Sequence, residues 1–319
     1  MAHLLRNRAS AILCAALILL TTSFAGPVAA EETLSIAGLR VAAWSPPPGV
    51  GKAPVIIFSH GFHGCATQSR FLMEALAKAG YLVFAPNHRD ATCDGGSATW
   101  RDKSEAPFTR VDVWSDAVFR DRADDIRRLL AALKTDQRWG ARGDWDRLGL
   151  AGHSLGGYTA LGLAGAWPSW RLDGVKAVLA LSPYDQPFIA QKTLGGLAAP
   201  VMYQGGTRDL GITPSVRKPG GGYDQSPAPK YFVEFEGAGH IAWANVPSAA
   251  HAGIVAYAQA FLDHYLKGTP ANAALTRKSS DVAELRYDSE LGRSGASPAQ
   301  TSSAHPLLDR LRQHAQQQP

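Results

Sequence analysis

Short apolar runs alternate with amphipathic stretches along most of the chain, from about residue 34 to residue 266. The apolar runs are too short for helices, so each predicts a buried strand. A loosely alternating segment at 34–45 predicts an antiparallel pair, and further strands are expected at 55–58, 81–85, 148–151, 175–181, 201–204 and 231–235. Helical spacing is found between them, at 68–79, 113–133, 155–166, 188–197 and 248–266. This alternation predicts an α/β protein with a mostly parallel eight-stranded sheet covered by helices on both faces.

The beginning of the chain departs from this pattern. Arg6 and Arg8 precede an apolar run at 9–24, and small residues then lead to Ala30. A basic start, an apolar run and a small-residue cleavage site are typical of a secretory signal peptide. The run is shorter than the roughly twenty residues of a bilayer span, so we expect cleavage after Ala30 rather than a stable membrane anchor. The sequence therefore predicts a signal peptide at 1–30 and a secreted or periplasmic mature chain.

The end of the chain is poor in apolar residues and rich in Ser, Ala, Gln and Pro. Such a composition buries too little apolar surface to fold, so 290–319 is predicted to be a disordered tail. The intervening residues, 31–289, are enough for one large α/β domain, which we expect to be a monomer.

The charge of the chain argues against a polyanionic partner. The formal net charge of +5 falls to +3 without the leader, and no dense basic run accompanies it. Nucleic-acid binding therefore has no electrostatic basis in the sequence. Because no cluster of His and Cys has the spacing of a zinc site, we expect neither a metal nor a cofactor.

Two cysteines, Cys65 and Cys93, remain after the leader. In an exported protein an even pair is more often a disulfide than a metal site, and two free thiols are the alternative. The two residues follow the strands at 55–58 and 81–85, which are expected to be neighbours. A disulfide between them would tie the first of these loops to the long segment at 87–114, which we expect to line the substrate cleft.

A glycine-flanked serine stands between a predicted strand and a predicted helix. The sequence from Gly152 to Gly157 reads Gly-His-Ser-Leu-Gly-Gly, which matches the G-x-S-x-G pattern. At a strand-to-helix turn this pattern places the serine on a tight elbow at the top of the sheet, with glycines leaving room for close backbone approach. Ser154 is therefore the predicted nucleophile.

A serine hydroxyl needs a base within hydrogen-bonding reach, and the base needs an orienting acid. His240 lies directly after the strand at 231–235 and is the predicted base. Asp185 and Asp209 each follow a predicted strand, and either can reach the same edge of the sheet. We favour Asp209 as the acid, because the glycine-containing segment after it has the character of a site-forming loop.

Backbone N–H groups near the nucleophile are expected to form an oxyanion hole. One donor should be Leu155, directly after the nucleophile, and the other Phe62, in the glycine-rich loop after the strand at 55–58. The residues expected to contact substrate are Gly61, Phe62 and Tyr184. His60 and His153 are expected to brace the site by hydrogen bonds rather than to transfer protons.

Several motifs also resemble a known superfamily, namely His60-Gly61-Phe62, Asn87-His88-Arg89-Asp90, Gly152 to Gly157, Gly205 to Asp209 and Gly237 to His240. Over roughly residues 50–268 they resemble the α/β-hydrolases, in particular the platelet-activating-factor acetylhydrolase and dienelactone-hydrolase-like branch and the cutinase-like polyester hydrolases. In the cutinase-like enzymes the acid lies at the place of Asp209, and in the acetylhydrolases it lies nearer Asp185. Dienelactone hydrolases carry cysteine where this chain has Ser154.

The sequence thus predicts an exported serine carboxylic ester hydrolase that acts through an acyl-enzyme. No long insertion follows the strand at 175–181, so no large lid domain is expected and the cleft should be open to short acyl esters or polyesters. A peptidase or amidase on the same fold and a catalytically silent binding protein are the alternatives.

Overall fold

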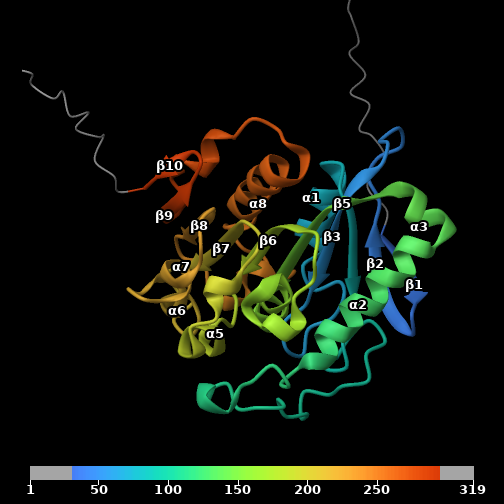
Figure 1. Cartoon of the computed structure of the whole chain (residues 1–319), viewed down its shortest axis with the longest axis horizontal. Coiled ribbons are helices and arrows are strands. Elements are labelled where there is room, and N and C mark those ends of the chain that lie inside the picture. The colour runs from blue at the N-terminus through green and yellow to red at the C-terminus, as the bar shows by residue number, and fades with distance from the viewer. Residues whose placement is uncertain (1–30, 295–319) are drawn as a thin grey trace, which may run out of the picture.

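A ten-stranded mixed sheet runs through residues 31–294, which are the residues that this computed structural model describes (Figure 1). The strand order is β1-β2-β4-β3-β5-β6-β7-β8-β9-β10. The strands are β1 Glu31–Ile36, β2 Leu39–Trp44, β3 Ala53–Ser59, β4 Leu82–Pro86, β5 Gly143–His153, β6 Val175–Leu181, β7 Val201–Gly206, β8 Lys230–Phe235, β9 Val282–Ser289 and β10 Gly292–Arg293. The predicted signal peptide, 1–30, and residues 295–319 of the predicted tail lie outside the described residues.

The six central strands, β3 to β8, pair in parallel, while β1, β2, β9 and β10 pair antiparallel at the two edges. Parallel strands all finish on the same side of the sheet, and ligands bind at these carboxyl ends in open α/β sheets. Residues that follow β3, β5, β6, β7 and β8 are therefore close in space although they are far apart in sequence.

The prediction of eight strands is wrong at the C-terminal edge, where β9 and β10 add a hairpin. β9 pairs antiparallel with β8, and only Val282 among its residues is fully buried. An edge strand that is half exposed has a weak apolar pattern, so its sequence does not stand out from a loop. The second strand of the hairpin, β10, falls within 290–319, the segment predicted to be a tail.

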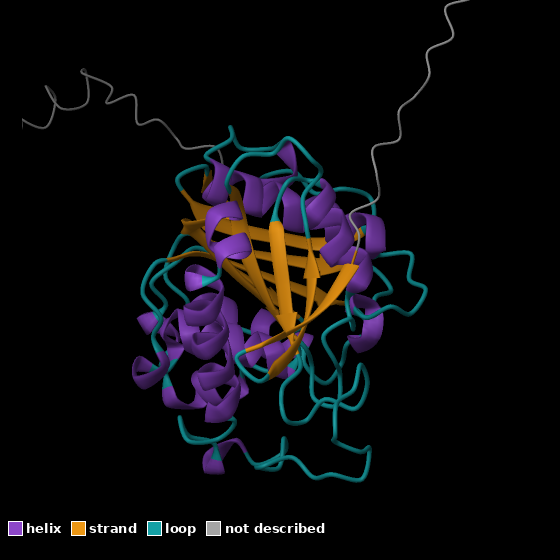
Figure 2. Cartoon of the chain, turned by 90° about the vertical axis from the view of Figure 1, so that its right-hand side faces the viewer, coloured by secondary structure: helices purple, strands orange, loops and turns teal. Residues whose placement is uncertain are grey.

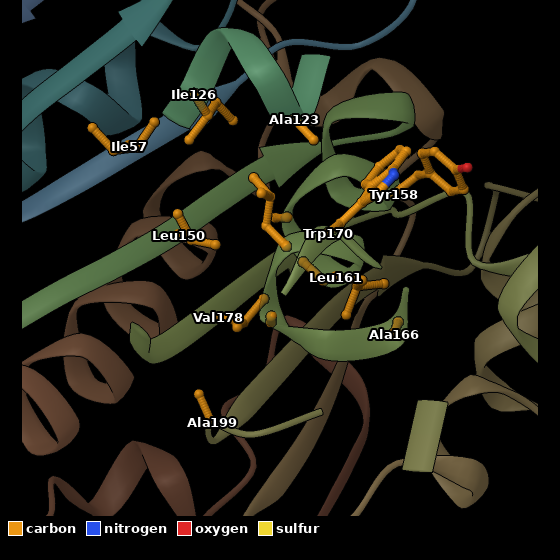
Figure 3. Close-up of a cluster of buried hydrophobic side chains, with 14 of the residues drawn as sticks. Ile57, Ala123, Ile126, Leu150, Tyr158, Leu161, Ala166, Trp170, Val178 and Ala199 are labelled. Atoms are coloured by element: carbon orange, nitrogen blue, oxygen red, sulfur yellow. The ribbon is translucent and has the colours of Figure 1, made fainter. Parts of the chain in front are cut away.

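Helices cover both faces of the sheet (Figure 2). The helices are α1 Arg70–Lys78, α2 Arg120–Thr135, α3 Gln137–Arg142, α4 Leu155–Leu161, α5 Gln186–Gln191, α6 Thr213–Arg217, α7 Gly222–Gln225 and α8 His251–Lys267. Successive strand residues face opposite cores, so Val55 and Ile57 pack on one side and Ile56 and Phe58 on the other. Figure 3 shows part of the first core, with side chains from the sheet, α2 and α4: Ile57, Leu150, Val178, Ile126 and Leu161.

The helix α2 begins at Arg120, later than the predicted start at 113. Trp114 is buried before the helix, and Phe119 has a left-handed backbone with a φ of 58°. A non-glycine residue in this conformation interrupts a helix, so the preceding residues form a loop that extends along the lower edge of the view in Figure 1. Among residues 31–294, no helix is both long and apolar enough to cross a membrane.

Candidate active site

Ser154 lies on a sharp turn between β5 and α4, with φ 55° and ψ −117°. A non-glycine residue in this region of backbone space is strained and is held by its surroundings. Its N–H donates to the carbonyl of Leu181 at 3.0 Å, and its carbonyl accepts from the N–H of Tyr184 at 3.0 Å. A Cβ at Gly156 would overlap the carbonyl of Ser59. The G-x-S-x-G pattern therefore forms the predicted elbow, with a glycine where α4 packs directly against the end of β3.

The structure brings Ser154, His240 and Asp209 together at the carboxyl edge of the sheet. His240 follows β8, and its Nε2 lies 3.0 Å from Ser154 Oγ. Its Nδ1 lies 3.2 Å from Asp209 Oδ1, and Asp209 follows β7. The His240 side chain is 37 % exposed and the Asp209 side chain 2 %. The imidazole can therefore reach substrate while the carboxylate behind it is shielded from water.

Asp209 is held as a carboxylate by several donors. Thr213 Oγ1 donates to its Oδ2 at 3.0 Å, and Ser182 Oγ donates to the same oxygen. Burial acts to raise the pKa of Asp209, but the hydrogen bonds from His240, Ser182 and Thr213 outweigh it and keep that pKa below its usual value. The negative charge therefore persists beside the imidazole at neutral pH.

Asp185, the alternative acid, lies at the start of α5 and its carboxylate has a different partner. Its Oδ1 accepts a hydrogen bond from Ser215 Oγ at 2.5 Å, and its Oδ2 has no partner in the described part of the chain. The residue is fully buried, and this burial raises the pKa of Asp185 to about 7. The structure thus places Asp209, and not Asp185, against His240.

Ser182 is a site residue that the sequence reasoning did not single out. It follows β6, and its Oγ lies 2.8 Å from His240 Nδ1 while it donates to Asp209 Oδ2. Because its single proton goes to the carboxylate, Ser182 Oγ accepts from the Nδ1–H of His240. The signal that could have found it is its position directly after the strand that neighbours β5 in the sheet.

The two predicted oxyanion donors belong to backbone segments next to Ser154. Leu155 is the first residue of α4, and N–H groups in the first turn of a helix have no acceptor within that helix. Phe62 lies in the loop after β3, and the neighbouring Gly61 approaches the nucleophile so closely that an added Cβ would lie 3.4 Å from Ser154 Cβ. Both backbone segments are thus adjacent to the hydroxyl.

His153, one of the two residues predicted to brace the site, makes hydrogen bonds of the kind expected. His153 Nε2 donates to the carbonyl of His240 at 2.8 Å, and its Nδ1 accepts from Gln68 Nε2 at 2.8 Å. Burial is the main cause that lowers the pKa of His153 to about 3, so the ring is neutral. Gln68 Oε1 in turn accepts from the N–H of Gly61 at 2.9 Å. A continuous chain of hydrogen bonds therefore links the loop of the base to the loop after β3.

A family model described as the alpha/beta hydrolase fold matches residues 54–199. This chain has the α/β-hydrolase fold. The match covers the loop after β3 and the elbow at Ser154, whereas Asp209 and His240 lie beyond it. No curated protein matches this α/β-hydrolase. The match names no branch of the superfamily, so the resemblance to acetylhydrolases, dienelactone hydrolases and cutinase-like enzymes stays a prediction.

The nucleophile of this α/β-hydrolase opens into a cavity of about 700 Å³. Its lining residues come from the segments after each of the six parallel strands, β3 to β8, and they are Phe62, Phe108, Thr109, Ser154, Tyr184, Gln186, Arg208, Asp209, Leu210, Gly211, Ile212 and His240. Phe62 and Tyr184 thus lie where substrate contact was predicted, while Gly61 is outside the lining. Phe108 and Thr109 belong to the long segment at 87–114, which reaches the cleft as expected.

Cys65 and Cys93 form a disulfide in this α/β-hydrolase, with their Cα atoms 5.4 Å apart. The bond confirms the predicted pairing and joins the loop after β3 to the loop after β4. The same two loops share further contacts, because Asn87 Oδ1 accepts from the N–H of Ala66 at 2.7 Å and Thr92 Oγ1 donates to the carbonyl of His63 at 2.6 Å. The backbone beside the nucleophile is therefore fixed from outside the cavity.

Proposed function

We propose that this α/β-hydrolase is a serine carboxylic ester hydrolase that acts through an acyl-enzyme. The observation that carries the proposal is the continuous contact from Ser154 Oγ through His240 to Asp209 at a cavity. Nucleophile, acid and base follow one another in the chain order of this fold, each after a different strand. A base that bridges a hydroxyl and a buried carboxylate is the arrangement that activates serine for acyl transfer.

In the first half of the reaction, Ser154 Oγ attacks the ester carbonyl carbon while His240 Nε2 takes its proton. The carbonyl electron pair moves onto oxygen, and the N–H groups of Phe62 and Leu155 would stabilise that negative charge. When the carbonyl re-forms, the bond to the alkoxy oxygen breaks and the proton on His240 leaves with the alcohol. The acyl group is then bound to Ser154.

In the second half, water replaces the alcohol. The oxygen of water attacks the acyl carbon while His240 Nε2 takes a proton from that water. The N–H groups of Phe62 and Leu155 would again stabilise the negative charge on the carbonyl oxygen. The bond to Ser154 Oγ breaks, the proton returns to that oxygen, and the carboxylic acid is released. Throughout, Asp209 stabilises the imidazolium and keeps the Nδ1 proton in place.

The cavity supports the class of substrate. Aromatic and aliphatic side chains, including Phe62, Phe108 and Ile212, make its walls, and Leu210 is 80 % exposed at its rim. Outside the triad, Thr109, Gln186 and Arg208 add polar side chains to these mainly apolar walls, and such a cavity suits an acyl chain or an aromatic ring with a polar ester group. We propose short acyl esters or polyesters as substrates, because no lid domain stands over the cleft within residues 31–294.

We also propose that the mature protein acts outside the cytoplasm. The predicted signal peptide and the disulfide between Cys65 and Cys93 support export, because disulfides persist in oxidising compartments. Expression of the full chain followed by N-terminal sequencing of the secreted or periplasmic product tests this. The expected mature N-terminus is Glu31, and a product that keeps its leader in the cytoplasm would contradict the proposal.

A fluorophosphonate probe combined with a p-nitrophenyl ester series tests the proposed activity. Ser154 should be labelled covalently in the native protein and not after heat denaturation, and Ser154→Ala should lower kcat by at least about 10³-fold. The preferred chain length, from acetate to palmitate, reports the depth of the cavity. An unlabelled Ser154 would favour a binding protein, and faster turnover of matched amides than esters would favour the amidase alternative.

A further inference from the structure

Arg122 is a fully buried arginine of α2 that the mechanism above does not use. Arginine is almost never fully buried unless it is paired. Its partner is Asp90, whose two oxygens lie 2.8 Å and 2.6 Å from Arg122 Nη2, and Nε also donates to Oδ1 at 3.1 Å. Burial acts to raise the pKa of Asp90, but the charge of Arg122 outweighs it and keeps that pKa below its usual value, so the pair is ionic.

The remaining donors of Arg122 reach the loop that follows β3. Its Nη1 donates to the carbonyl of His60 at 2.7 Å, and its Nη2 lies 3.4 Å from the carbonyl of Gly61. Asp90 Oδ2 accepts from the N–H of His63 at 3.4 Å. The ion pair thus contacts the backbone of the loop on both sides of Phe62, the predicted oxyanion donor.

The carbonyl of Gly61 is held by two further donors, the N–H of Gly64 at 2.9 Å and His60 Nδ1 at 2.7 Å. The direction of the second bond follows from the other nitrogen of the ring, since His60 Nε2 accepts from the N–H of His88 at 3.0 Å. Burial, the largest cause, lowers the pKa of His60 well below its usual value, so the ring is neutral and its proton is on Nδ1.

The carbonyl of Gly61 and the N–H of Phe62 belong to one peptide plane. In a trans peptide these two groups point in opposite directions, so fixing the carbonyl also fixes the N–H. The preceding plane behaves in this way, because the carbonyl of His60 accepts from Arg122 while the N–H of Gly61 points to Gln68 Oε1. The N–H of Phe62 is therefore directed away from the donors that hold the carbonyl of Gly61, and Phe62 itself lines the cavity that contains Ser154.

We propose that Arg122 is a positioning residue that, together with Asp90, aims the N–H of Phe62 at the oxyanion. The inference rests on the proposed function, because it needs an oxyanion at Ser154. A buried ion pair is weak grounds for stability on its own, since desolvation of both charges offsets their attraction. The backbone contacts of Arg122 give this pair a different role, which is to hold one peptide plane in a single orientation before substrate arrives.

A charge-neutral double variant, Arg122→Gln with Asp90→Asn, tests the proposal without leaving one buried charge unpaired. Loss of an oxyanion donor costs about 10²–10³ in kcat, so a misdirected donor should cost about 10–100-fold. We expect that loss in kcat for p-nitrophenyl acetate with a KM changed less than about threefold. Phenylboronic acid, which forms a tetrahedral anionic adduct on serine, should bind more weakly by the same factor as kcat/KM falls.

The matched control is Lys267→Gln with Asp263→Asn, which removes a half-buried ion pair from α8. Lys267 also donates to the carbonyl of Ala79, just before β4 begins, so this pair lies at the opposite edge of the sheet from Ser154. The control should lose stability and keep kcat and boronate affinity within about twofold. If the test variant does not fold, Arg122→Lys is the second variant, because it keeps the positive charge but not the several N–H donors of the guanidinium. It should lose kcat and boronate affinity together, by a smaller factor than the double variant.

A folded test variant with unchanged kcat and boronate affinity would overturn the proposal, and so would a loss confined to KM. Failure of the proposed function has a different signature. In that case the wild-type protein neither hydrolyses p-nitrophenyl acetate nor reacts with a fluorophosphonate, and both inferences fall together.

Discussion

At the residue scale, the hydrogen bonds around His240 decide where its proton lies. Asp209 Oδ1 and Ser182 Oγ both face Nδ1, at 3.2 Å and 2.8 Å, and both act as acceptors there. The neutral ring therefore carries its proton on Nδ1, which leaves a lone pair on Nε2 toward Ser154. Since Ser182 also donates to Asp209, the two acceptors hold each other in place. The tautomer that a general base needs is thus set by two residues rather than by the acid alone.

The dual role of Ser182 gives a prediction. Ser182→Ala removes a donor to Asp209 and an acceptor from His240 Nδ1 while leaving the triad atoms present. We expect kcat to fall about tenfold, as for the loss of a hydrogen bond to a charged group, with little change in KM. Steady-state kinetics on a p-nitrophenyl ester measure this, and an unchanged kcat would show that Asp209 alone orients the ring.

The choice between the two candidate acids gives a second prediction. Asp209→Asn should lower kcat by about 10³–10⁴-fold, because the amide can favour the wrong tautomer of His240. Asp185→Asn is the matched control, since it makes the same chemical change at a buried carboxylate hydrogen-bonded to Ser215. It should leave kcat within a few-fold of wild type. A larger loss in the control than in the test variant would identify Asp185 as the acid.

At the element scale, the strand ends determine which residues meet. Each loop after β3, β5, β7 and β8 delivers one part of the site, so strand periodicity together with the G-x-S-x-G pattern was enough to predict Ser154, His240 and the neighbouring loop. Ser182 directly follows β6 and could have been found by the same rule. Arg122 could not, because it lies within α2 and only the folded chain brings it to Asp90 and the loop after β3. The edge strand β9 was not predicted for another reason. Most of its residues are half-exposed, so its sequence lacks the apolar run that marks a buried strand.

The disulfide between the loops after β3 and β4 gives a third prediction. Its cysteines are 28 residues apart, and closing a loop of that length stabilises the fold by roughly 3–4 kcal/mol in the chain-entropy estimate. Cys65→Ser with Cys93→Ser should lower the free energy of unfolding by about that amount in urea titrations. Dithiothreitol should cause the same loss in the wild type and none in the double variant. Equal stability of the two proteins without reductant would contradict the prediction.

At the scale of the whole molecule, Asp185 couples stability to pH through burial. It is enclosed between α5 and the segment of α6 and α7, where Ser215 donates to it and Gly222 lies so close that an added Cβ would overlap Asp185 Oδ2. Burial raises the pKa of Asp185 from 3.8 to about 7. Between these values the unfolded chain has already lost the proton that the folded chain keeps. The contribution of Asp185 to the free energy of unfolding therefore falls as pH rises from about 4 to 7, and it is constant above about pH 7.

Asp185→Asn should remove this slope. The free energy of unfolding of the variant minus that of wild type should increase by a few kcal/mol between pH 4 and pH 8, since each pKa unit corresponds to about 1.4 kcal/mol. Any fixed cost of the amide cancels in that difference. Asp209→Asn is the control of opposite sign, because the pKa of Asp209 is lowered and wild type gains stability over this variant as pH rises through the acidic range. Urea titrations at several pH values measure both differences. If the free energies of unfolding of wild type and Asp185→Asn changed with pH in parallel, the carboxylate would ionise in the folded protein as it does in the unfolded chain, and the prediction would be wrong.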